Sequence, residues 1–98
     1  MKKTWKISYK GNEIVVVNTW QNEQLFVNGE LQDEQNGYAG RSRLWGHIET
    51  RSGERESIKV SIGSGGWGGI ICVVFIDDQL VFRSNSKRYK ELKPIRRN

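Results

Sequence analysis

The stretch Leu25–Gln32 reads LFVNGELQ and decides the fold class of this chain. Two short runs with apolar, β-favouring residues flank the dipeptide Asn28-Gly29. Asn-Gly is the strongest two-residue signal for a β-hairpin, because both residues tolerate a positive φ. The stretch therefore predicts two antiparallel strands joined by a tight turn.

The strand pattern continues on both sides of this hairpin. Apolar and polar residues alternate over Trp5–Lys10 and Ser57–Ile62, as in strands with one buried and one solvent-exposed face. Two other runs, Ile14–Val17 and Ile70–Ile76, are continuously apolar. Such β-branched runs favour central strands that are covered on both faces.

Turn signals separate these runs at Gly11-Asn12, Ser52-Gly53-Glu54 and Asp77-Asp78. With a further strand near Arg43–Thr50, the pattern predicts about seven or eight strands. A chain of 98 residues has room for one domain with one core. We therefore expect an all-β, antiparallel β-sandwich or small barrel, built from hairpins, over residues 1–83.

Two segments lie outside this strand pattern. Asp33–Gly40 contains Asn36-Gly37 and is predicted to be an exposed loop. Residues 84–98 form a basic C-terminal tail. The tail is either one short helix that begins near Ser84 and ends at Pro94, or a frayed extension.

A weak internal repeat runs through the chain. Lys6–Tyr9 resembles Lys59–Ile62, and Phe26–Leu31 resembles Phe75–Leu80. One hypothesis is a duplicated unit spanning residues 6–32 and 59–81. The alternative is that alternating strands with polar turns resemble one another by chance.

The net charge of +5 belongs to the tail and not to the body of the chain. Seven basic residues and one acidic residue follow from Arg83 onward, whereas residues 1–82 hold nine basic and ten acidic residues. A basic tail can contact nucleic-acid phosphates in a salt-sensitive, sequence-independent way, or it can simply keep the protein soluble. The candidate phosphate contacts are Lys87, Arg88, Lys90, Arg96 and Arg97.

Localisation can be predicted from the cysteine count and the N-terminus. Cys72 is the only cysteine, so no intramolecular disulfide can form. The N-terminal lysines are not followed by the apolar stretch of a signal peptide, and no apolar run is long enough to span a bilayer as a helix. We therefore expect a cytoplasmic protein without a membrane partner.

The chain contains few residues suited to catalysis or metal binding. His47 and Cys72 are the only residues of their kinds, whereas zinc needs three or four such ligands. Apolar neighbours raise the pKa of a thiol and lower its reactivity, and the acidic pairs fall at turns or on exposed strand faces. We expect no enzyme activity, no cofactor and no metal site.

The glycine-rich segment Gly63–Gly69 matches the pattern G-x-G-x-x-G. A dinucleotide-binding loop of this pattern leads into a helix, but an apolar strand follows here, so a phosphate loop is not predicted. Trp67 in this segment is either presented to a partner or folded back over the core.

An aromatic and cationic patch is predicted around Trp45. Trp45 and His47 are opposite in phase to Leu44 and Ile48 in the expected strand, so they point away from the face that this apolar pair shares. If a second sheet does not cover that face, the patch suits a protein interface or a stacking surface for bases or sugars; if a second sheet covers it, Trp45 belongs to the core. The predicted partner-binding residues are Arg41, Arg43, Trp45, His47 and Trp67.

The order of these features resembles the Fas apoptotic inhibitory molecule family. The resemblance rests on Val27-Asn28-Gly29, Leu44-Trp45-Gly46, the alternating Ile58–Ile62, Gly66-Trp67 and the Ile76-Asp77-Asp78 turn. It implies a non-enzymatic β-sandwich of repeated hairpins with a role in protein interaction. It implies no catalytic or binding residues.

Two functions are expected from the sequence. The first is a non-catalytic module that binds another protein or associates with itself, including as a homodimer. The second is a nucleic-acid-binding module in which the tail contacts phosphates and an aromatic face stacks bases.

Overall fold

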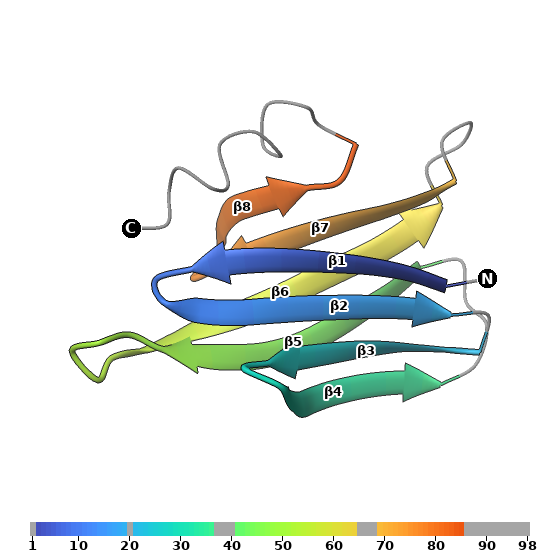
Figure 1. Cartoon of the computed structure of the whole chain (residues 1–98). Helices are drawn as coiled ribbons and strands as arrows, with labels where there is room; N and C mark the ends of the chain where they lie inside the picture. Colours follow the sequence, from blue (N-terminus) through green and yellow to red (C-terminus); the bar gives the residue numbers. More distant parts are fainter. Residues whose placement is uncertain (1, 20, 37–40, 65–68, 86–98) are drawn as a thin grey trace.

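The computed structural model describes residues 2–19, 21–36, 41–64 and 69–85. Within these ranges the chain forms eight antiparallel strands and no helix (Figure 1). The strands are β1 (Lys2–Tyr9), β2 (Asn12–Thr19), β3 (Asn22–Val27), β4 (Glu30–Asn36), β5 (Arg41–Glu49), β6 (Arg55–Ser64), β7 (Ile70–Ile76) and β8 (Gln79–Arg83). The predicted all-β fold is confirmed. None of the described ranges holds a helix that could cross a membrane.

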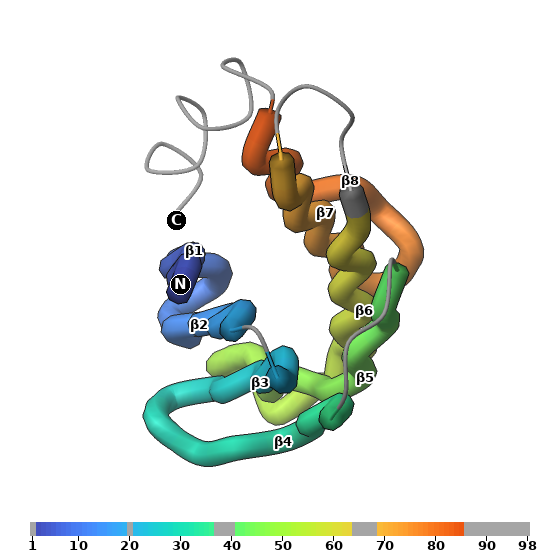
Figure 2. The backbone as a smooth tube through the Cα atoms, turned by 90° about the vertical axis from the view of Figure 1, so that its right-hand side faces the viewer, coloured from blue at the N-terminus to red at the C-terminus, as the bar shows by residue number. Residues whose placement is uncertain are grey.

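The strands form two four-stranded sheets with the orders β1-β2-β3-β4 and β5-β6-β7-β8. Each strand therefore pairs with its neighbours in sequence, as expected of a chain of hairpins. The two sheets lie one behind the other in Figure 1. In Figure 2, β4 and β5 lie close together while β1 and β8 are farther apart. The sheets stay separate, so the sandwich is the correct one of the two predicted architectures.

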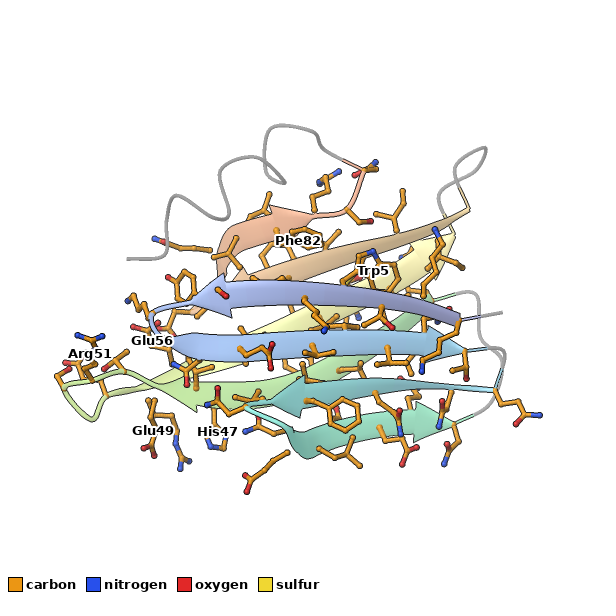
Figure 3. All side chains as sticks on the ribbon, in the orientation of Figure 1. Trp5, His47, Glu49, Arg51, Glu56 and Phe82 are labelled. Atoms are coloured by element: carbon orange, nitrogen blue, oxygen red, sulfur yellow. The ribbon has the colours of Figure 1, made fainter. Side chains whose placement is uncertain are left out.

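The hydrophobic core lies between the two sheets and takes side chains from both. Figure 3 shows Trp5 of β1 and Phe82 of β8 directed into this space. The core consists mainly of β-branched residues, which pack well on a pleated surface. Its buried members are Ile7, Ile14, Val16, Leu25, Val27, Leu44, Ile48, Ile58, Val60, Ile62, Cys72, Val74, Ile76 and Phe82.

The two continuously apolar runs lie in the interior strands β2 and β7, as predicted, but the prediction that both faces are covered is wrong for β7. In β7, Cys72, Val74 and Ile76 are buried, whereas Ile71 and Phe75 are half-buried and face outward. Each sheet of a two-layer sandwich has one covered face, and no third layer occurs among the described residues. The outward residues of this continuous run therefore give the second sheet a partly apolar outer surface.

The predicted loop over Asp33–Gly40 is wrong in its first half. β4 continues to Asn36, because Glu34 pairs with Gln24 and Asn36 with Asn22. The composition of Asp33–Asn36 favours a turn, but these residues form a strand because β3 is long enough to pair with them. Residues 37–40 lie outside the described ranges.

The first hairpin turn is Lys10-Gly11, one residue earlier than the predicted Gly11-Asn12. Both turn residues have positive φ values, 49° and 80°. Asn12 is the first residue of β2, where it pairs with Tyr9.

The hairpins β3–β4 and β7–β8 have the same construction. Both residues of each turn have positive φ, 51° and 86° at Asn28-Gly29 and 49° and 65° at Asp77-Asp78. Each hairpin has a register shift just before its phenylalanine, and Phe26 pairs with Leu31 as Phe75 pairs with Leu80. The predicted similarity of Phe26–Leu31 and Phe75–Leu80 therefore corresponds to two equivalent structural elements.

The other half of the proposed repeat does not correspond in this way. Lys6–Tyr9 lies in β1, at the edge of its sheet, whereas Lys59–Ile62 lies in the interior strand β6. By position in the sheets, β1 corresponds to β5 and β2 to β6. The alternation shared by Lys6–Tyr9 and Lys59–Ile62 reflects a common strand pattern and not equivalent positions.

Candidate functional site

The outer face of the β5–β8 sheet carries the candidate site. Cross-strand partners in a sheet point to the same side, so the register defines rows of side chains across this face. One row runs Trp45, Lys59, Phe75 and Leu80, from β5 to β8. Trp45 is 56% exposed, although tryptophan is usually mostly buried.

The next two rows add cations beside Trp45. Arg43 pairs with Ser61, which pairs with Val73 and then Arg83, while Arg41 pairs with Gly63 and then Ile71. No Asp or Glu occurs in these three rows as far as the structure describes them. We call this surface, formed by Arg41, Arg43, Trp45, Lys59, Ser61, Gly63, Ile71, Val73, Phe75, Leu80 and Arg83, the cationic face.

Lys59 has a fixed place in the cationic face. Its Nζ lies 4.7 Å from the ring centroid of Phe75 on the neighbouring strand. A cation above an aromatic ring is attracted by the negative face of the ring. The ammonium group of Lys59 is therefore held over Phe75, in the same row as Trp45.

Side chains of β4 hold the strand that carries Trp45. The Trp45 N–H donates to Asp33 Oδ2 over 2.7 Å, and the His47 N–H donates to Gln32 Oε1 over 2.8 Å. Gly46 lies between them, where a Cβ would collide with Gln32 Oε1. The absence of a side chain at Gly46 thus allows Gln32 to reach β5.

His47 lies away from the cations of the predicted patch. It is half-buried and lines a small hollow of about 170 Å³ together with Gln32 and Glu30 of β4. Figure 3 places it near Glu49, at the end of the sheet where β5 leaves for its turn. His47 is therefore at the margin of the cationic face.

A Cys–His pair does not form. Cys72 is fully buried on the inner face, and burial raises the pKa of its thiol from 9.0 to about 12. The register pairs His47 with Ser57 and Cys72 with Ile62, so the two lie five residues apart along β6, or about 16 Å at the usual strand rise. The thiol therefore stays protonated at neutral pH, and His47 is too far away to act as its base.

No cluster of three or more His, Cys, Asp or Glu side chains that could hold a metal ion occurs among the described residues.

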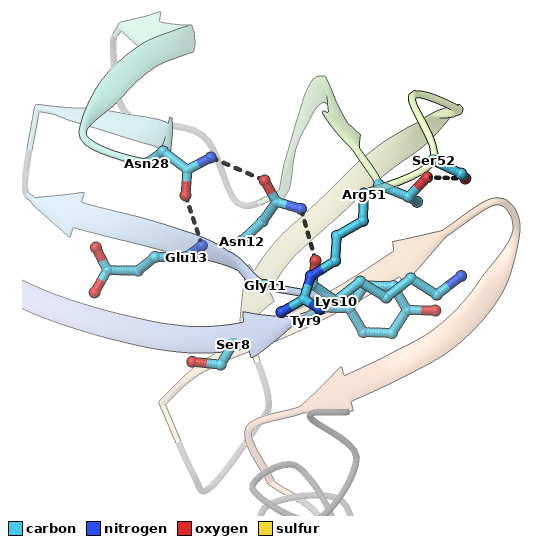
Figure 4. Close-up of a pocket in the computed structure, with 10 residues that line it drawn as sticks. Ser8, Tyr9, Lys10, Gly11, Asn12, Glu13, Asn28, Arg51 and Ser52 are labelled. Carbon is cyan, nitrogen blue, oxygen red and sulfur yellow. Dashed lines mark hydrogen bonds between the residues drawn. The ribbon is translucent and has the colours of Figure 1, made fainter.

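A cleft of about 780 Å³ lies at the end of the sandwich where three turns meet (Figure 4). Asn12 and Asn28, which line it, are engaged in hydrogen bonds of the fold. Asn28 Nδ2 donates to Asn12 Oδ1 over 2.8 Å, and Asn12 Nδ2 donates to the Glu49 carbonyl over 2.9 Å. These bonds tie the ends of both sheets together, and this cleft is best explained as a structural junction.

The sequence placed Arg41, Arg43 and Trp45 in one patch, and the structure brings these three side chains to one face. Lys59, Phe75 and Arg83 were not predicted to belong to it. The signal for Phe75 was present in the run Ile70–Ile76 and that for Lys59 in the alternation of Ser57–Ile62, since alternate residues of a one-sided strand must face outward. Trp67 and the basic residues Lys87, Arg88, Lys90, Arg96 and Arg97 lie outside the described ranges.

No protein-family model, no curated protein and no solved structure matches this chain.

Proposed function

We propose that this chain is a non-catalytic binding module and that the cationic face is its contact surface for a macromolecule. The observation that carries the proposal is the exposed indole of Trp45 in a row with Lys59 and beside Arg43. Tryptophan and arginine are the residue types that most often dominate binding energy at interfaces.

A binding role fits the chemistry of the described residues better than catalysis. The thiol of Cys72 is buried, with its pKa raised to about 12. Two of the acidic side chains near the turns hold backbone groups of the fold: Asp77 Oδ1 accepts from the Ser57 N–H over 2.8 Å, and Asp33 Oδ2 accepts from the Trp45 N–H over 2.7 Å. Because such groups hold the hairpins in place, they are structural.

The resemblance to the Fas apoptotic inhibitory molecule family stays a prediction, compatible with the two-sheet architecture. Its implied role in protein interaction falls within the proposed function. A cytoplasmic location is part of the proposal, supported by a single buried cysteine that remains a free thiol.

Site-specific photo-crosslinking tests the proposal. A photoreactive benzoylphenylalanine in place of Trp45 is expected to give discrete macromolecular adducts in cells. The same group in place of Leu31, which is 49% exposed on the other sheet, is the matched control. Adducts at neither position, or the same adducts at both, would show that the cationic face is not the contact surface.

A further inference from the structure

We infer that the cationic face binds single-stranded nucleic acid, with Trp45 stacking on a base and the neighbouring cations contacting phosphates. The inference rests on the proposed function, because it names the partner of the same face.

The charge of the face requires a partner with many negative charges. Arg41 and Arg43 on β5, Lys59 on β6 and Arg83 on β8 share this side of the sheet. Within the described ranges none of these four cations forms a salt bridge, since the ion pair there joins Lys10 to Glu56, and the Asp33 carboxylate beside Trp45 accepts from the Trp45 N–H. A phosphate backbone supplies repeated negative charge, and arginine binds phosphate through two parallel hydrogen bonds.

The position of Trp45 adds a stacking surface among these cations. Its side chain is 56% exposed, and every base has a π-face that can stack on an indole. Lys59 lies opposite Trp45 on the next strand, about 4.8 Å away in backbone spacing, and Arg43 lies two residues along β5, about 6.8 Å away. Phosphates on either side of a stacked base can therefore each meet a cation.

Lys59 is already positioned before a ligand arrives. Its Nζ sits 4.7 Å from the centroid of the Phe75 ring, which restricts a side chain that otherwise loses considerable rotamer entropy on binding. Phe75 is thus a positioning residue for Lys59, whereas Trp45 offers the open ring.

The face fits nucleic acid better than a protein or a second copy of this chain. Tryptophan and arginine are enriched in protein interfaces, but the cores of those interfaces are depleted in lysine, whereas in this face Lys59 lies directly beside Trp45. The large hydrophobic side chains exposed within the described ranges are Trp45 and Leu31, on opposite sheets. A second copy would also bring the same positive charge to the contact.

A single strand fits better than a duplex. Stacked base pairs in a duplex hide the base faces that Trp45 would contact, while a single strand exposes bases and phosphates together. Four-stranded sheets that stack two or three bases on outward aromatic side chains are an established mode of single-strand recognition.

Fluorescence anisotropy of a labelled single strand of about 15 nucleotides and mixed sequence, titrated with the full chain, tests the inference. Trp45→Ala is expected to raise Kd by about 5- to 150-fold, the range measured for loss of one base–aromatic stack. Trp45→Phe is expected to recover most of the affinity. Leu31→Ala on the other sheet is the control, with an expected change of less than about twofold.

Salt dependence tests the phosphate contacts separately. Removing one phosphate contact with Arg43→Gln is expected to lower the slope of log K against log salt by about 0.7. A duplex of the same length is expected to bind more weakly than the single strand and to be insensitive to Trp45→Ala.

Three results would overturn the inference. They are absence of single-strand binding, binding that Trp45→Ala leaves unchanged, and binding that is lost only when Lys87, Arg88 and Lys90 of the tail are all replaced by Gln. Crosslinking at position 45 separates the two proposals. If protein adducts form but the single strand does not bind, the proposed binding module stands and the nucleic-acid inference is rejected. If neither adducts nor single-strand binding is found, both proposals are rejected.

Discussion

The Asp33 carboxylate of β4 accepts a hydrogen bond from the backbone N–H of Trp45 in β5, over 2.7 Å. The two strands belong to different sheets, so this bond and the adjacent one from His47 to Gln32 take the place of a backbone ladder at this corner. They satisfy edge N–H groups of β5 that would otherwise be open to pairing with another chain. The strand that carries Trp45 is thereby held to the first sheet.

Asp33→Ala is expected to lower the free energy of unfolding by about 1 kcal/mol, because the N–H of Trp45 loses its acceptor at a partly exposed position. Urea unfolding followed by circular dichroism measures the change. Asp33→Asn keeps an acceptor oxygen at the same place and is expected to lose less. An equal loss in both variants would show that the bond to Trp45 contributes nothing.

Gly46→Ala is expected to cost about 1–3 kcal/mol, the usual range for forcing an extra methyl group into a packed site. The new Cβ would overlap Gln32 Oε1 and lie 2.9 Å from Leu25 Cδ2. Thermal unfolding of the variant measures the loss, with a fall in Tm of about 4–8 °C for each kcal/mol.

A double-mutant cycle with Gln32→Ala separates the two clashes at Gly46. If the amide of Gln32 is the main obstacle, Gly46→Ala costs less in the Gln32→Ala background, and the coupling energy exceeds about 0.5 kcal/mol. Additive effects would place the obstacle at Leu25 instead.

The two equivalent hairpins predict opposite effects at matching turn positions. Gly29 has φ +86° and open space around it, so Gly29→Ala is expected to destabilise by about 1 kcal/mol through backbone strain alone. Asp78 occupies the corresponding position with φ 65°. Asp78→Gly creates the favoured Asp-Gly turn and is expected to stabilise by up to about 1 kcal/mol. Changes of the same sign in urea unfolding would contradict the equivalence.

Cys72 is expected to be inert in the folded protein. Burial raises the pKa of its thiol from 9.0 to about 12, so iodoacetamide at pH 8 is expected to modify it only as fast as the protein opens. Rapid and complete modification under native conditions would contradict this burial.

The raised pKa of Cys72 also predicts how stability changes with pH. Between pH 9 and about 12 the unfolded chain loses the thiol proton while the folded chain keeps it, so the stability of the fold falls as pH rises through this window. Comparison of wild type with Cys72→Ala isolates the effect, because other titrating groups contribute to both. Below pH 8, the difference in the free energy of unfolding between wild type and Cys72→Ala is expected to be independent of pH.

The local features of this protein were predicted from neighbouring residues alone. Asn28-Gly29 and Asp77-Asp78 turn the chain because their backbones tolerate positive φ. Period-two alternation fixes the opposite orientations of Leu44 and Trp45 in β5, and the structure has Leu44 buried and Trp45 exposed. Most of the strands, the turns at Asn28-Gly29 and Asp77-Asp78, and the opposite orientations of Leu44 and Trp45 therefore followed from the sequence.

The sequence could not specify how separate hairpins meet. Nothing local shows that Asp33 of a predicted loop would bond to Trp45, or that Gly46 would make room for Gln32. These contacts depend on the packing of one sheet against the other.

By itself, then, the sequence determined an all-β chain of hairpins with Trp45, Arg41 and Arg43 on the strand face opposite to Leu44 and Ile48, whereas the tertiary structure decided that this face is not covered by the other sheet. Only the tertiary structure decided that Lys59, Phe75 and Arg83 lie on the same face. The physical reason is that alternation orients each side chain relative to its own strand, whereas hydrogen-bond register and sheet packing decide which strands are neighbours.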